Sequence, residues 1–263
     1  MRRPPITVIA AGLAVSAVAG CGPSGSSAST SPSRSKPAAL SGSITVFAAA
    51  SLKEAFTAIG RRFEAAHPGV KVTFSFGASS GLATQITSGA PADVFASASP
   101  KNMRQVVAAG DALAPVNFAK NVMEVAVPPA NPAHVTSLDD LAKSPVKVAL
   151  CQPQVPCGAV AAKVFGNARI TVTPVTLEPD VKSVLGKVEL GDVDAGVVYV
   201  TDVNAAGAKV KGVPIPDRVN ASTVYPIATI SKSGNAATAR AFVAYVVSAA
   251  GESLLSAAKF EKP

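Results

Sequence analysis

The chain has 263 residues, 48% of them hydrophobic, and a formal net charge of +8 at pH 7. This length suits one large domain or two lobes, and the apolar content excludes a chain that lacks a folded core. A basic chain can bind nucleic acid, a membrane surface or an anion. No run of Lys and Arg with interleaved aromatic residues occurs, so nucleic acid is not an expected partner.

The N-terminus has the features of an export signal. Two arginines precede an apolar stretch, residues 6–20, that is too short to span a bilayer. Its end, Val18 to Cys21, resembles the bacterial lipobox, in which a small residue precedes a cysteine that becomes lipidated. An ordinary apolar segment with a buried cysteine is the alternative. We predict a signal peptide over residues 1–20 and a lipid such as palmitate on Cys21.

The segment 21–41 begins with this cysteine and is otherwise mostly Ser, Ala, Pro and Gly without apolar periodicity. Such a composition is typical of a flexible tether. A coil of about 20 residues reaches roughly 25 Å. We therefore expect a body held at the outer face of the cell membrane, close to a membrane transporter.

The three cysteines can be assigned from this context. With Cys21 bound to lipid, Cys151 and Cys157 remain as a pair in an oxidising compartment, which predicts a disulfide. A zinc site is the alternative, but His67 and His134, the two histidines, have no ligand-like spacing to this pair. We expect no direct protein ligands to a metal.

The body alternates strand-like and helix-like patterns in two series. β-branched apolar runs indicate strands, and apolar residues at helical spacing indicate helices. The first series has strands at 44–49, 70–76 and 93–96, each followed by a helix, and the third helix begins at Pro100. The second has strands at 122–127, 146–150, 170–175 and 195–200, with helices after Ser137, over 157–165 and over 180–190. A strand at 224–230 and helices at 236–247 and 252–258 end the chain.

Strands that alternate with helices predict parallel α/β sheets. We assign residues 42–121 plus 224–263 to a first lobe and residues 122–223 to a second. Ligands of open α/β sheets bind beyond the carboxyl ends of the strands. A ligand cleft is therefore expected between the two lobes.

Hydroxyl side chains stand where two of these helices begin: Ser51, and Ser79 with its neighbour Ser80. Ser51 and Glu54 also fit a capping box, in which the serine caps the helix and the glutamate reaches back. Free N–H groups and the helix dipole make a helix start an anion site without Lys or Arg. Simple helix capping is the alternative for each serine alone. The combination predicts a site of uncharged donors for a small anion.

Patterns for catalysis are weak. Neither Ser51 nor Ser79 has a credible base, because one histidine lies in a His-Pro-Gly turn and the other in a Pro-rich loop. The loop at residues 77–81 lacks the Lys-Ser or Lys-Thr pair of a nucleotide P-loop. A secreted Ser-dependent hydrolase stays as an alternative, and so does an iron-binding protein, although Tyr199, Tyr225 and Tyr245 lie on separate predicted elements.

Four segments resemble periplasmic molybdate-binding proteins of ABC importers: ITVFAAASL at 44–52, FGASSGLATQI at 76–86, GAPADVFASA at 89–98 and DAGVVYVTD at 194–202. The resemblance runs in order over nearly the whole body. It implies the type II periplasmic-binding-protein fold, in which two α/β lobes are joined by a hinge around a ligand cleft. It also implies a monomer that binds molybdate or tungstate without a cofactor and passes it to the transporter permease.

The resemblance further implies the contacts with the ligand. The hydroxyls of Ser51, Ser79 and Tyr199 and the backbone N–H groups of Cys157 and Val181 would donate to its oxygens. Such a site suits molybdate, which carries no proton at neutral pH, so no acidic residue is expected to touch the ligand. Sulfate or another tetrahedral oxyanion is the nearest alternative.

Overall fold

Strands and helices alternate along residues 39–263, the part of the chain that the computed structural model describes. The predicted signal peptide, Cys21 and residues 21–38 of the predicted tether lie outside these residues. Ala39–Pro263 forms one unit by its internal contacts. None of its helices combines the length and the apolar character needed to cross a lipid bilayer.

The strands of this unit form a mixed sheet in the order β2-β1-β3-β9-β4-β7-β5-β6, with β8 paired to β4. The strands are β1 (Gly42–Ala49), β2 (Val70–Gly77), β3 (Val94–Ala96), β4 (Ala112–Val127), β5 (Val148–Cys151), β6 (Thr176–Glu178), β7 (Ala195–Tyr199), β8 (Lys211–Pro214) and β9 (Ser222–Ile230). The α-helices are α1 (Lys53–Ala66), α2 (Ser79–Thr87), α3 (Pro100–Ala108), α4 (Pro156–Ala168), α5 (Val181–Glu189), α6 (Val200–Ala206), α7 (Ala236–Val246) and α8 (Ala249–Ala257). Short 3-10 turns are η1 (Ala50–Leu52), η2 (Leu138–Ala142) and η3 (Gly207–Lys209).

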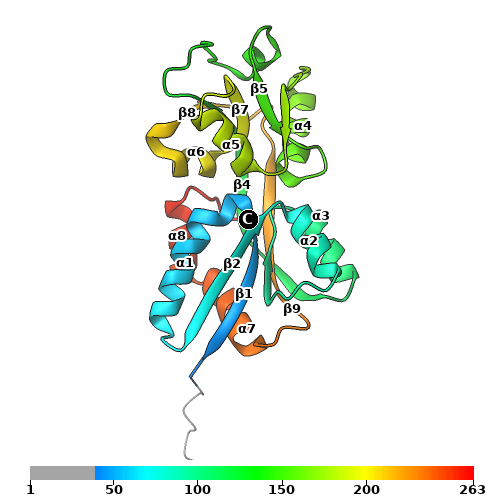
Figure 1. Cartoon of the computed structure of the whole chain (residues 1–263), viewed down its shortest axis with the longest axis vertical. Helices are drawn as coiled ribbons and strands as arrows, with labels where there is room; N and C mark the ends of the chain where they lie inside the picture. The colour runs from blue at the N-terminus through cyan, green and yellow to red at the C-terminus, as the bar shows by residue number, and fades with distance from the viewer. Residues whose placement is uncertain (1–38) are drawn as a thin grey trace, which may run out of the picture. The chain divides into compact units, whose positions relative to one another are not determined.

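Two parallel groups of strands are joined by two antiparallel strands. β1 is parallel to both β2 and β3, and β5 is parallel to both β6 and β7. β9 is antiparallel to β3, and β4 is antiparallel to β9 and β7. Figure 1 shows β4 and β9 running from one group of elements to the other.

The apolar residues form separate cores around the two parallel groups. One cluster contains Phe56, Phe63 and Phe242, and a second contains Phe95; both lie with β1–β3, β9 and the helices α1–α3, α7 and α8. A Val-rich cluster lies with β5, β7 and the helices α4 and α5. We call the elements β1–β3, β9, α1–α3, α7 and α8 the first lobe, and β5–β8 and α4–α6 the second lobe. The residue limits predicted for the lobes stay a prediction.

Some predicted elements are wrong. The stretch after Ser137 forms only the short turn η2, and Pro145 soon follows it. Residues 170–175 contain Pro174, which cannot donate to a strand ladder, and the strand β6 begins after them. The strand predicted at 122–127 begins ten residues earlier, at Ala112, because its pairing with β9 extends it. The predicted strand 195–200 ends at Tyr199, where the helix α6 begins.

Replacing Phe242 by Ala should lower the free energy of unfolding by about 3–5 kcal/mol, the usual cost of removing a fully buried phenyl ring. The Phe242 ring is 0% exposed and packs against Phe56, Phe63 and Phe74. Urea denaturation followed by circular dichroism measures the change. Leu190→Ala is the control, because Leu190 is 78% exposed. A loss under about 1 kcal/mol for the Phe242 variant would contradict the core as described.

Candidate functional site

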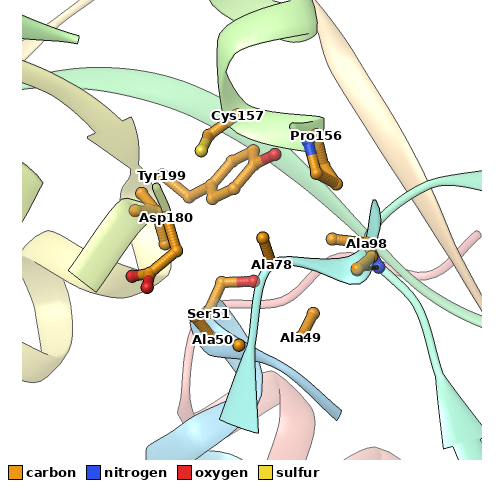
Figure 2. Close-up of a pocket in the computed structure, with 12 residues that line it drawn as sticks. Ala49, Ala50, Ser51, Ala78, Ala98, Pro156, Cys157, Asp180 and Tyr199 are labelled. Atoms are coloured by element: carbon orange, nitrogen blue, oxygen red, sulfur yellow. Dashed lines mark hydrogen bonds between the residues drawn. The ribbon is translucent and has the colours of Figure 1, made fainter. Parts of the chain in front are cut away.

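A small cavity lies where strand ends and helix starts from both lobes meet, and Figure 2 shows its lining. Its volume is about 20 Å³. This is little more than the roughly 10–15 Å³ that a single water needs on the same measure. The cavity is therefore small and suits a compact ion. Its lining residues are Ala49, Ala50, Ser51, Gly77, Ala78, Ser79, Ala98, Pro156, Cys157, Asp180, Val181 and Tyr199.

All five residues predicted to donate to a ligand line this one cavity. Ser51 and Ser79 follow the neighbouring parallel strands β1 and β2. Cys157, Val181 and Tyr199 come from the second lobe, at the starts of α4 and α5 and at the end of β7. In Figure 2, Tyr199 and Cys157 lie across the space from Ser51. The structure brings the predicted residues together, while their contact with a ligand stays a prediction.

Ser51 does not cap the helix that follows it, so the predicted capping box is wrong. The turn η1 separates β1 from α1, which begins at Lys53 without a side-chain cap. Ser51 is 4% exposed, and its hydroxyl lies 2.9 Å from the Tyr225 hydroxyl. The Glu54 carboxylate pairs with Lys182 at 2.8 Å. Both side chains of the expected box have partners from elsewhere in the fold.

Ser79 begins α2 and is 1% exposed. Its hydroxyl oxygen accepts a hydrogen bond of 2.9 Å from the Ala98 N–H. A serine hydroxyl has one hydrogen to donate, and this accepted bond leaves that hydrogen for the cavity. Ser80, by contrast, does not line the cavity. Of the two serines, only Ser79 therefore lies at the cavity.

The second lobe presents two helix starts to the cavity. The N–H groups of Cys157 and Val181 lie in the first turns of α4 and α5, where a helix offers them no acceptor of its own. Within residues 39–263 neither N–H has an acceptor. Both amides are thus free to donate to a group in the cavity, and the dipoles of the two helices favour an anion there.

The predicted disulfide is present and stiffens one of these helix starts. Cys151 ends β5 and is joined to Cys157 in the first turn of α4. Gly158 follows, and a Cβ at this position would collide with the backbone of Gln152. In the turn between β5 and α4, the backbone at Gly158 therefore lies close to the backbone at Gln152, and this close contact fixes the position of the Cys157 N–H.

An acidic residue, Asp180, is among those that line the cavity, while the expectation that no acidic residue touches the ligand stays a prediction. Asp180 is the N-cap of α5, and its Oδ1 accepts from the N–H groups of Lys182 at 2.8 Å and Ser183 at 3.1 Å. The carboxylate is engaged by the helix, so the Val181 N–H remains as the unpaired donor of this turn. The sequence placed Asp180 at the helix start but did not reveal that it faces the cavity.

Tyr199 contributes a buried hydroxyl that lacks a partner. The residue is 1% exposed, and its hydroxyl makes no hydrogen bond within the described part of the chain. Burial raises the pKa of the Tyr199 phenol well above its usual value, so the group stays protonated. A buried hydroxyl left unpaired costs about 1–3 kcal/mol. Tyr199 is therefore a donor that a ligand in the cavity would satisfy.

Lys182, which follows the lining residue Val181 in the chain, is already paired and does not line the cavity itself. The Lys182 ammonium lies 2.8 Å from Glu54 on α1 and 3.0 Å from the fully buried Asp202 on α6. Burial alone would lower the pKa of Lys182, but the two carboxylates outweigh burial and raise it. Burial also raises the pKa of Asp202, and Lys182 opposes that shift. This ion-pair group connects the two lobes beside the cavity.

Tyr225 lies behind the cavity and was not predicted as part of the site. The three tyrosines lie on separate elements, as predicted, yet the ring centroids of Tyr199 and Tyr225 are only 6.3 Å apart. No group of three or more His, Cys, Asp or Glu among residues 39–263 could hold a metal ion. Local sequence carried no signal for Tyr225, because its partner Ser51 is 174 residues away.

The chain is similar to known binding proteins in sequence and in structure. Residues 44–261 match the family described as bacterial extracellular solute-binding protein. The molybdate-binding protein ModA of Mycobacterium tuberculosis is 42% identical over 260 residues, which cover 98% of this chain and 97% of that protein. The periplasmic molybdate-binding protein of Azotobacter vinelandii has a TM-score of 0.75 at 21% identity, covering 84% of this chain and 99% of that one. The sulfate-binding protein SubI of Mycobacterium tuberculosis has a TM-score of 0.72 at 20% identity, and the match covers 84% of this chain and 86% of that one. These structures confirm the predicted two-lobe α/β fold.

Replacing both Cys151 and Cys157 by Ser should lower the free energy of unfolding by about 2 kcal/mol, because the bridge closes only a short loop. The two cysteines are six residues apart in the sequence. Urea denaturation of the variant and of the wild type gives the difference. Reductant added to the wild type should reproduce the loss and leave the variant unchanged. Equal midpoints for all samples would show that the bridge adds nothing to stability.

Proposed function

Because the chain belongs to the bacterial extracellular solute-binding proteins, we propose that its cavity binds molybdate and that the protein delivers this ion to an ABC importer. The main support is the convergence of uncharged donors from both lobes on a cavity sized for one small ion. The relative from Mycobacterium tuberculosis, named as a molybdate-binding protein, adds to this support. Tungstate has the same charge and shape and is proposed as a second ligand.

The donors suit an anion that carries no proton. Hydrogen bonds to a charged acceptor are stronger than those between neutral groups. Hydrogen phosphate would present an O–H that needs an acceptor in the cavity. The Ser79 oxygen already accepts from the Ala98 N–H, and Asp180, whose Oδ1 accepts from two amides, is the one carboxylate of the lining. Molybdate needs donors alone, whereas hydrogen phosphate would have to bring its O–H to Asp180.

Sulfate is the alternative ligand within the same class. It is also a dianion without a proton at neutral pH, and the same donors would satisfy it. The fold does not decide between the two ions, because the solved molybdate- and sulfate-binding proteins match this chain almost equally. The size of the cavity decides, so affinity has to be measured for both.

A hydrolase is disfavoured by the surroundings of the two serines. Within the described residues, Ser51 bonds to Tyr225 and Ser79 accepts from the Ala98 N–H. Neither serine has a His, Asp or Glu as hydrogen-bond partner, and a nucleophilic serine needs a base. Solute-binding proteins are transport components rather than enzymes, and this chain is one of them.

We further propose that the protein is a lipid-anchored monomer at the outer face of the cell membrane. The lipobox-like end of the apolar N-terminal segment supports lipidation of Cys21 with a chain such as palmitate. The disulfide is consistent with an oxidising compartment. The segment 21–41 would then keep the binding unit near the permease.

Binding would close the two lobes around the anion, with β4 and β9 as the connecting strands. Each lobe alone holds only part of the donor set, so both must approach for the anion to lose its water. The contact between Lys182 on α5 and Glu54 on α1 joins the two lobes. We propose that it slows the release of the ligand.

Ser51→Ala, Ser79→Ala and Tyr199→Phe should each weaken molybdate binding about 10- to 100-fold, because each removes a hydrogen bond to a charged acceptor. Isothermal titration calorimetry of residues 39–263 measures the dissociation constants. Ser80→Ala, one residue from Ser79, is the control and should stay within about twofold of the wild type.

The wild type should also gain stability with its ligand, by about 2.7 kcal/mol at a concentration of 100 times the dissociation constant. Molybdate and tungstate should raise the melting temperature at concentrations where phosphate does not, and sulfate tests the alternative. The absence of any shift with molybdate and tungstate would refute the proposed ligand.

Glu54→Gln should raise the dissociation rate of molybdate about 2- to 5-fold, because partly exposed ion pairs contribute little but measurable energy. The change leaves the Lys182–Asp202 pair of the second lobe intact. Exchange of bound radioactive molybdate against unlabelled molybdate measures the rate directly. The association rate does not report on this contact alone, because removing the negative charge of Glu54 also weakens the repulsion of the incoming anion.

Glu252→Gln is a matched control for this charge change. Glu252 is 46% exposed, close to the 47% of Glu54, and pairs with Lys262 at 3.0 Å away from the cavity. Its dissociation rate should equal that of the wild type. Equal rates for both variants would show that the contact between α1 and α5 does not hold the ligand in.

A further inference from the structure

We infer that Tyr225 is a positioning residue that directs the hydrogen of the Ser51 hydroxyl toward the bound anion. The inference rests on the proposed function, since it concerns how the oxyanion is recognised. Tyr225 does not line the cavity, so it acts through Ser51 and not by its own contact.

Tyr225 is held rigidly behind Ser51. It is 0% exposed, and its hydroxyl lies 2.9 Å from the Ser51 Oγ. Its ring packs edge-on against Phe118 at 6.2 Å and Phe260 at 5.4 Å, and also meets Tyr199. A hydroxyl fixed in this way can orient the hydroxyl that it contacts.

The direction of the hydrogen bonds follows from Asn121. Its Oδ1 accepts from the Val122 N–H at 3.1 Å, so its Nδ2 faces Thr201 at 2.8 Å and Tyr225 at 3.5 Å. An amide nitrogen only donates. The Tyr225 oxygen is therefore the acceptor for Asn121, although this bond is long, and the Tyr225 hydrogen is left for Ser51.

The opposite direction is unfavourable. Among residues 39–263 the Tyr225 hydroxyl makes hydrogen bonds only with Ser51 and Asn121, and the Tyr199 hydroxyl makes none, so a Tyr225 hydrogen turned away from Ser51 would have no hydrogen bond in this structure. A buried donor without a partner is costly. Burial also raises the pKa of the Tyr225 phenol, so this group keeps its hydrogen. Ser51 therefore accepts from Tyr225 and donates into the cavity.

In this arrangement the hydroxyl oxygens of both first-lobe serines accept a hydrogen bond, each from a different donor. The Ala98 N–H occupies the Ser79 oxygen, and the Tyr225 O–H occupies the Ser51 oxygen. Each hydroxyl presents its hydrogen to the anion. The hydrogen bonds from Asn121 to Tyr225 and from Tyr225 to Ser51 thus fix the Ser51 hydroxyl as a donor. Without them this hydroxyl could rotate and act as an acceptor.

A double-mutant cycle tests this inference, with molybdate dissociation constants measured by calorimetry. Tyr225→Phe should weaken binding about 3- to 30-fold in the wild type and in the Ser79→Ala variant. In the Ser51→Ala variant it should change binding less than about twofold, because coupling appears only between residues that act through each other. A merely structural role of Tyr225 would weaken all three proteins by the same factor.

Tyr245→Phe is the matched control, because Tyr245 packs on Phe63 in the first lobe and does not line the cavity. Its affinity should equal that of the wild type. If Tyr225→Phe does not fold, Asn121→Ala tests the same chain of bonds, with a smaller loss in the wild type and none in Ser51→Ala.

The outcomes separate the inference from the proposed function. Wild-type affinity for Tyr225→Phe, or an equal loss with and without Ser51, overturns the inference while the protein still binds molybdate. A wild type that binds no molybdate overturns the proposed function, and the inference with it.

Discussion

An anion buried without a contacting cation has to be stabilised by hydrogen-bond donors alone, because removing a charge from water is costly. The cavity of this protein meets that condition with hydroxyls and first-turn amides. Such donors help only if their hydrogens point inward. Much of the surrounding structure serves this purpose. The Ala98 N–H donates to the Ser79 oxygen, and Asp180 accepts from the N–H groups of Lys182 and Ser183 but not from that of Val181. The disulfide stiffens the start of α4.

The two-lobe fold divides these donors between two bodies. Parallel strands bring Ser51 and Ser79 to one edge of the first lobe, while the second lobe supplies two helix starts and Tyr199. The antiparallel strands β4 and β9 pass between the lobes, so a change in their course would move one donor set relative to the other. The Lys182 group adds a contact across the same gap, with its charge balanced by carboxylates on both sides.

The errors of sequence analysis have a common physical origin. Ser51 and Glu54 fit a capping box in spacing, but both side chains found partners on other elements. Pro174 ended a strand that the β-branched residues around it predicted, and the pairing of β4 with β9 extended a strand beyond its apolar core. In each case a long-range contact or a missing donor overrode a local preference.

The sequence by itself determined the order of most strands and helices, the disulfide pair and five residues that line the cavity, because apolar periodicity, turn residues and the family motifs are local features. It could not determine which side chains from distant parts of the chain contact each other around the cavity. Tyr225 meets Ser51 across 174 residues, and Lys182 meets Glu54 from another lobe. Only the tertiary structure decided these contacts, since they depend on how strands far apart in the chain are placed side by side.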